Sequence, residues 1–179
     1  TLLDNTIKNA KIVIKKYPNS KYIDKSYLLI GISMFYKGRY ESSIKNLEKI
    51  ITSKDPDITS EAHLWIAFSY LRLNDNEKVT NYINKLQKSK LDRENLYVYF
   101  LIKAEILENN GLFNESYDTY KHAASITKAI SRKNFVFRKL IQLADENEDI
   151  ESKIIFIEFL SENLNDLNKI KDLKIDWIE

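Results

Sequence analysis

One segment decides the fold: SYLLIGISMFYKGRYESSIKNLEKII, residues 26–51. Apolar residues recur in it every three or four positions, which is the spacing of amphipathic helices. Gly31 stands deep inside the first helical run, where glycine costs about 0.5–1 kcal/mol relative to alanine. We therefore expect a second helix to approach the backbone closely at Gly31.

Two further segments align with residues 26–51 without gaps: AHLWIAFSYLRLNDNEKVTNYINKLQ at 62–87 and YFLIKAEILENNGLFNESYDTYKHAA at 99–124. The alignment places Gly31, Ala67 and Ala104 together, and a weaker fourth copy adds Leu140, so the steps are 36, 37 and 36 residues. A fixed period of this size is typical of a repeat array.

The same alignment predicts where the helices turn. Gly38, Asn74, Gly111 and Asn147 coincide, and glycine and asparagine both tolerate the positive φ of a helix C-terminus. Apolar periodicity predicts helices at residues 3–17, 22–37, 40–53, 58–73, 76–89, 93–109, 113–130, 132–145, 149–163 and 166–178. Short loops make consecutive helices antiparallel neighbours. We expect an all-α protein, a single domain over residues 1–179.

These residues resemble the tetratricopeptide repeat. The match is carried in the first repeat by Tyr27, Ile30, Gly31, Gly38, Tyr40, Ser43 and Leu47, in the second by Ile66, Ala67, Tyr70, Val79 and Ile83, and in the third by Ala104, Gly111, Phe113, Ser116, Tyr120 and Ala123. The resemblance implies a right-handed α-α superhelix of about four stacked helix pairs, preceded by a half repeat and closed by a capping helix.

The period of 36–37 residues and the phrase YPNSKYID (17–24) are similar to bacterial tetratricopeptide lipoproteins of the outer membrane and periplasm, of the barrel-assembly type. This likeness favours an envelope location over a cytoplasmic one. It implies a scaffold that binds a protein partner, as a monomer or within a hetero-complex. Two alternatives stay open: a structural subunit that binds through its ends and edges, and an auxiliary domain of a longer chain.

In tetratricopeptide arrays the first helix of each pair lines the concave face. The corresponding positions here are Leu28, Ile32, Phe35, Tyr36, Leu64, Phe68, Leu71, Arg72, Leu101, Glu105 and Glu108. The resemblance thus implies a groove that is apolar in the first two repeats and acidic by the third, with Phe35, Phe68 and Leu71 as anchors for an apolar segment. The opposing interpretation is that the fold itself buries these side chains.

Composition argues against most chemistry. There is no cysteine among the 179 residues, which excludes disulfides and thiolate sites, and the two histidines, His63 and His122, fall in different repeats, where we expect them on the surface or half-buried. We expect no catalytic residue, no metal, no cofactor and no enzyme. We also expect no membrane span, because apolar runs of about 20 residues are missing.

Charge is unevenly distributed along the chain. Residues 1–60 hold 11 basic and 6 acidic side chains, residues 61–140 hold 13 and 9, and residues 141–179 hold 4 and 11, giving +5, +4 and −7. A nucleic-acid binder would concentrate basic residues on one face, so we expect no nucleic-acid partner.

The segment SKIIFIEFLSENL, residues 152–164, is apolar almost all round. A helix of this kind has to be covered on more than one side. The sequence predicts that residues 166–178 cover it with a stripe of Leu167, Ile170, Leu173 and Trp177. The alternative is that this helix offers a surface to a second copy or to a partner.

Overall fold

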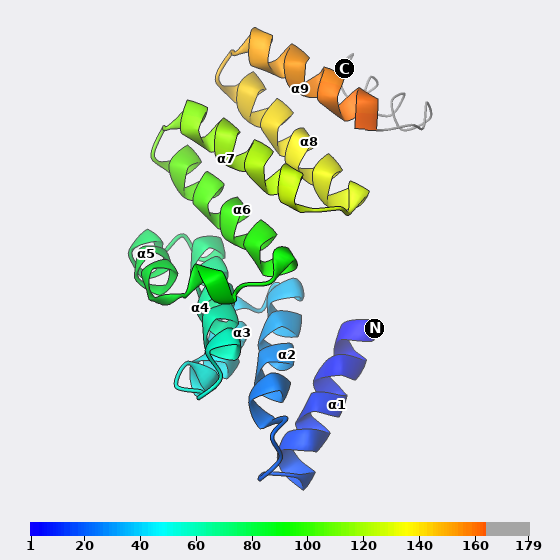
Figure 1. Cartoon of the computed structure of the whole chain (residues 1–179), viewed down its shortest axis with the longest axis vertical. Helices are drawn as coiled ribbons and strands as arrows, with labels where there is room; N and C mark the ends of the chain where they lie inside the picture. Colours follow the sequence, from blue (N-terminus) through cyan, green and yellow to red (C-terminus); the bar gives the residue numbers. More distant parts are fainter. Residues whose placement is uncertain (164–179) are drawn as a thin grey trace. The chain divides into compact units, whose positions relative to one another are not determined.

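The computed structural model describes residues 1–163, which form nine α-helices, two short 3₁₀ helices and no strand (Figure 1). The elements are α1 (Leu2–Lys16), α2 (Ile23–Tyr36), α3 (Tyr40–Leu47), η1 (Glu48–Ile50), α4 (Pro56–Arg72), α5 (Asn76–Lys85), η2 (Lys88–Lys90), α6 (Arg93–Asn109), α7 (Phe113–Ile126), α8 (Ile130–Glu146) and α9 (Ile150–Asn163). The all-α prediction is confirmed. The predicted helix at 166–178 lies outside the described residues.

Helix starts agree with the sequence to within two residues, but three helices end well before the point that periodicity predicts. Helix α3 gives way to η1 after Leu47, α5 ends at Lys85 and α7 at Ile126. At the end of α5, Leu86 is extended (ψ 147°), and the next N–H, that of Gln87, donates to Ser60 Oγ at 3.3 Å. Contacts outside the helix, which periodicity does not contain, thus set this end.

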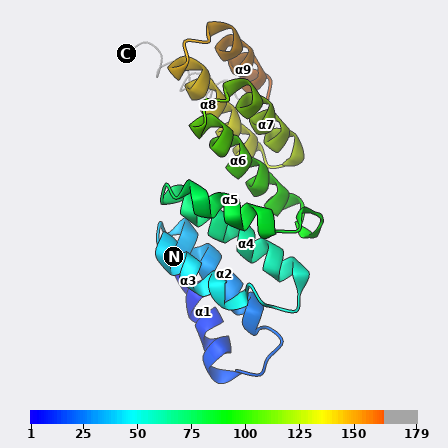
Figure 2. The same cartoon turned by 90° about the vertical axis from the view of Figure 1, so that its left-hand side faces the viewer.

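The chain divides into two compact units at a boundary inside α6, between Ile102 and Lys103. That residues 1–179 form a single domain remains a prediction. In the first unit each helix from α1 to α5 packs against the next, and α2 also packs against α4 (Figure 2). First helices of successive pairs therefore touch each other as well as their own partners.

The close approach predicted at Gly31 is present between α2 and α3. A Cβ atom added to Gly31 would lie 2.5 Å from Cγ of Leu47 and 2.6 Å from its Cδ2. Leu47 is completely buried, as are Ala67 and Ala104 at the positions equivalent to Gly31 in the next two pairs. A small residue at this point lets the helices of a pair lie together.

Four turns have the same geometry, a Schellman motif. At the first, the Gly38 N–H donates to the Phe35 carbonyl at 2.8 Å and the Arg39 N–H donates to the Met34 carbonyl at 2.9 Å. Gly38, Asn74 and Gly111 have φ values of 69°, 58° and 73°, as predicted. At the fourth turn the prediction is wrong by one residue. Glu148 has φ 56°, whereas Asn147 is the preceding cap with φ −100°.

The N-terminal helix packs against α2 through Ile7 and Ala10, and an ion pair links its first turn to the end of α2. Thr1 and Asp4 form a reciprocal capping box at the start of α1. Lys37, just after α2, places its Nζ 2.7 Å from Asp4 Oδ1. The ammonium group of Lys37, with the hydroxyl of Thr1, holds the pKa of Asp4 far below its usual range.

The second unit repeats the same pairing in α7, α8, α9 and the latter part of α6. The buried hydroxyl of Ser116 donates to the Ala104 carbonyl at 3.0 Å and so joins α7 to α6. Helix α9 packs against α8, and the rings of Tyr117 and Phe156 meet edge to face at 5.3 Å. The core contains Ala104, Tyr120, Val136, Leu140, Leu143 and Leu160.

Substituting Gly31 tests the close approach. Gly31→Ala should lower the free energy of unfolding, because overpacking a tight contact costs about 1–3 kcal/mol while the gain in helix propensity is only about 1 kcal/mol. The loss should shrink or reverse in a Leu47→Ala background, since the two residues share one contact. Urea denaturation of the four chains measures this coupling.

Gly38→Ala is the control. It also destabilises, through the left-handed backbone at φ 69°, but nothing lies within 4 Å of the added Cβ, so its cost should not depend on Leu47. Equal costs of Gly31→Ala in both backgrounds would contradict the assignment.

Candidate functional site

The fold divides the predicted groove residues into three groups. Five are buried: Leu28, Phe35, Leu64, Leu71 and Leu101. Four are half-buried: Ile32, Phe68, Glu105 and Glu108. Two are exposed: Tyr36 and Arg72. Two of the three predicted anchors, Phe35 and Leu71, therefore belong to the core of the chain itself.

The accessible face of α2 is rotated by one residue from the predicted one. Leu29 is 42% exposed, whereas Leu28 is 5% exposed. Lys25, Leu29, Ile32 and Tyr36 follow the spacing i, i+4, i+7, i+11 and form one stripe that is exposed or half-buried along its length. We call it the α2 stripe.

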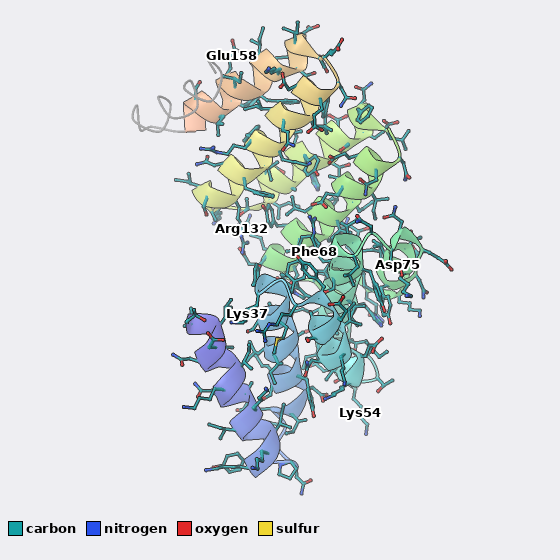
Figure 3. The ribbon with its side chains drawn as sticks, turned by 180° about the vertical axis from the view of Figure 1, so that it is seen from behind. Lys37, Lys54, Phe68, Asp75, Arg132 and Glu158 are labelled. Carbon is teal, nitrogen blue, oxygen red and sulfur yellow. The ribbon has the colours of Figure 1, made fainter. Side chains whose placement is uncertain are left out.

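A second stripe on α4, the α4 stripe, consists of Glu61, Trp65, Phe68 and Arg72, with the same spacing. The two stripes lie side by side. The charge of Lys25 acts on Glu61 near one end, and the rings of Tyr36 and Trp65 lie 5.5 Å apart near the other. Figure 3 labels Phe68 on α4.

Aromatic rings gather where the two stripes end. Phe35 is central, with ring centroids 4.6 Å from Phe68, 5.1 Å from Trp65 and 5.5 Å from Tyr40. The Arg72 guanidinium lies over Phe68 at 4.9 Å, a cation–π arrangement. The cluster therefore combines a buried aromatic base with exposed or half-buried edges at Tyr36, Phe68 and Arg72.

Sequence reasoning missed Leu29 and Trp65. The sequence does contain a signal for Trp65, because Glu61, Trp65, Phe68 and Arg72 share one helical spacing. For α2 the signal is weak, because residues 27–36 are apolar or aromatic at nearly every position and no polar side marks the surface. Only the neighbouring helices decide which side of α2 remains open.

A groove of about 360 Å³ lies between α1 and α2, next to the α2 stripe. Its walls are mostly apolar and include Ala10 and Val13 from α1 and Tyr22 and Leu29 from α2. Leu29 therefore belongs both to the stripe and to this groove. The accessible apolar surface continues from the groove along α2 to the aromatic cluster.

Burial perturbs two titratable groups near the stripes. Loss of solvent raises the pKa of the Glu61 carboxyl, and the charge of Asp92 raises it further, while a hydrogen bond from Asn95 acts in the opposite direction. Burial also raises the pKa of the Tyr97 hydroxyl to about 12. Both shifts have the same physical cause, the loss of solvent around the group on folding.

One of the two acidic residues predicted to line the groove in the third repeat, Glu108, interacts with other side chains of the second unit. Glu108 accepts a hydrogen bond from the Tyr120 hydroxyl at 2.9 Å and pairs with Lys139 Nζ at 2.9 Å. Its carboxylate is thus neutralised by a neighbour on α8. Glu105 is half-buried on the same helix.

The two histidines lie apart from each other, in α4 and α7. His63 is buried, contrary to expectation, and its pKa is lowered by desolvation, whereas His122 is exposed. Within residues 1–163 no group of three or more His, Asp or Glu side chains could hold a metal ion. In the same range no helix combines the length and the apolar character needed to cross a bilayer.

Comparison of the chain with protein-family models, with curated proteins and with solved structures finds no match.

Glu61→Gln tests the electrostatics at the base of the site. A carboxyl whose pKa is raised on folding destabilises the folded chain once it ionises, so stability falls as pH rises through the folded pKa. The variant should be more stable than the parent at pH 7, and the difference should vanish as pH falls to about 4.5, the ordinary pKa of glutamate. Thermal denaturation across this pH range measures it.

Glu77→Gln, at an exposed position on α5, serves as the control and should leave the pH dependence unchanged. A constant difference between Glu61→Gln and the parent at all pH values would contradict the role assigned to Glu61.

Proposed function

We propose that the chain is a protein-interaction module of the tetratricopeptide type, and that it holds an apolar segment of a partner protein along the α2 and α4 stripes. In this proposal its helix pairs stack into a right-handed superhelix, and its role is binding rather than catalysis. The partner is a protein, with no nucleic acid involved.

Three features support the tetratricopeptide assignment. Antiparallel helix pairs recur with a period of 36–37 residues, and left-handed turns recur at residues 38, 74, 111 and 148. Small buried residues stand at 31, 67 and 104. In the first unit the first helices of successive pairs, α2 and α4, also touch each other. Such stacking creates extended binding surfaces in repeat proteins.

The observation that carries the binding proposal is the exposed apolar side of α2. Leu29 and Tyr36 are exposed, with half-buried Ile32 between them, in a helix whose other sides are packed. A continuous apolar strip beside a groove is typical of a surface that receives another chain.

The anchors differ from those that the resemblance implies. Phe35 and Leu71 are buried in the core, so the groups left to contact a partner are Leu29, Tyr36 and the edge of Phe68. The buried ring of Phe35 contacts the rings of Tyr36 and Phe68, and the buried ring of Trp65 contacts that of Tyr36. Rigid aromatic groups of this kind often contribute about 2 kcal/mol or more each to an interface.

Selection from a random peptide display library against the purified chain tests the proposal. Enriched peptides should carry apolar side chains at helical or alternating spacing. Leu29→Ser and Tyr36→Ser should each weaken the best peptide by about tenfold or more, because an anchor is worth at least about 1.4 kcal/mol. Fluorescence polarisation measures the dissociation constants.

Leu112→Ser is a matched control, since Leu112 is 44% exposed and lies in the second unit. It should bind the peptide as the parent does, and all three variants should keep the parent's melting temperature. If the peptides bind Leu29→Ser and Tyr36→Ser with unchanged affinity, the two stripes are not the binding site.

A further inference from the structure

The first and last described helices carry the same side-chain pattern with opposite charge. On α1, Lys8, Lys11, Ile12 and Lys15 follow the spacing i, i+3, i+4, i+7, and all four are exposed. Their stripe lies next to the buried Ile7 and on the side of α1 away from the buried Ala10. We call it the basic end face.

The basic end face is hollowed. A shallow groove of about 400 Å³ runs along α1, lined by Lys8, Lys11, Lys15 and Lys16 together with Ile7, Ile12 and, at one end, Asp4. Lys8, Lys11 and Lys15 make no ion pair with any of residues 1–163. Four lysines, and the carboxylate of Asp4 that pairs with Lys37, therefore surround the two isoleucines.

On α9, Glu151, Ile154, Ile155 and Glu158 follow the same spacing, and all four are exposed. Ile154 and Ile155 are 52% and 43% exposed, on the side opposite the buried Phe156 and Leu160. Glu158 is labelled on α9 in Figure 3. We call this stripe the acidic end face.

We propose that the acidic end face of one copy docks on the basic end face of a second copy. Lys8 and Lys15 are seven residues apart, as are Glu151 and Glu158. Seven residues span about 10.5 Å of helix. Both carboxylates can thus meet both ammonium groups at once, while Ile154 and Ile155 cover Ile12 between them.

Charge dictates which faces join. Two basic end faces would place lysine against lysine, and two acidic end faces would place glutamate against glutamate. Only unlike faces attract, so the contact is heterologous. Two helical turns on each side make a contact below the usual interface size, so the association is weak and salt-dependent. This inference uses a different surface from the proposed peptide site and does not depend on it.

Sedimentation velocity of the full chain, from about 10 µM to about 1 mM, tests the proposal. At low salt the parent should self-associate as concentration rises, and the complexes should dissociate at about 0.5 M salt, where screening shortens to a few ångströms. Lys8→Gln with Lys15→Gln, and separately Glu151→Gln with Glu158→Gln, should each weaken self-association by about tenfold or more.

The decisive arm mixes the two double variants. Each has one intact end face, so the mixture should form a heterodimer and stop there. A contact between like faces predicts instead that one double variant still pairs with itself. That result would overturn the proposal.

A parent chain that stays monomeric at every concentration and salt would also overturn it. If the Glu151→Gln, Glu158→Gln variant then lost thermal stability, the acidic end face would be covered within the same chain, as the sequence suggests for residues 166–178. Unchanged self-association of both double variants would place the contact elsewhere and refute the two end faces.

Discussion

The contact between Gly31 and Leu47 is the constraint on which the first helix pair depends. Leu47 is fully buried and occupies the space where a Cβ of residue 31 would stand. A side chain at residue 31 would displace Leu47 or push the two helices apart. Once the pair closes, the short turn at Gly38 fixes α3 antiparallel to α2, and the side of α2 away from α3 becomes available to α1 and α4.

The repeat made much of the fold predictable. Small residues at 31, 67 and 104 and turn residues at 38, 74 and 111 each leave a trace in the sequence, because few residue types satisfy a close approach or a positive φ. The fourth turn is different. Glu148 takes the left-handed conformation next to an asparagine that does not. The side chain of Asn147 instead donates from Nδ2 to the Leu143 carbonyl at 2.7 Å, and the sequence contains no sign of this one-residue shift.

The candidate site was less predictable, for a physical reason. Periodicity locates the open side of a helix only when that side is polar. Helix α2 contacts α1, α3 and α4 and is therefore apolar on several sides, so Leu28 and Leu29 cannot be told apart without their neighbours. The buried status of Phe35 and Leu71 likewise depends on how closely α2 and α4 approach. The sequence therefore predicts that α2 and α4 are rich in apolar side chains, but it does not predict which of these side chains face the core and which face the surface.

In the proposed stacked array, the two end helices face opposing demands. An end helix lacks a neighbour on one side, and an uncovered apolar side would lead to aggregation, so terminal repeats carry polar outer faces. Lysines on α1 and glutamates on α9 meet this demand while leaving Ile12, Ile154 and Ile155 between them. Because the charged residues of each stripe have a single sign, identical stripes repel each other. The same charges that keep like ends apart are complementary between unlike ends, which gives specificity by repulsion as well as by attraction.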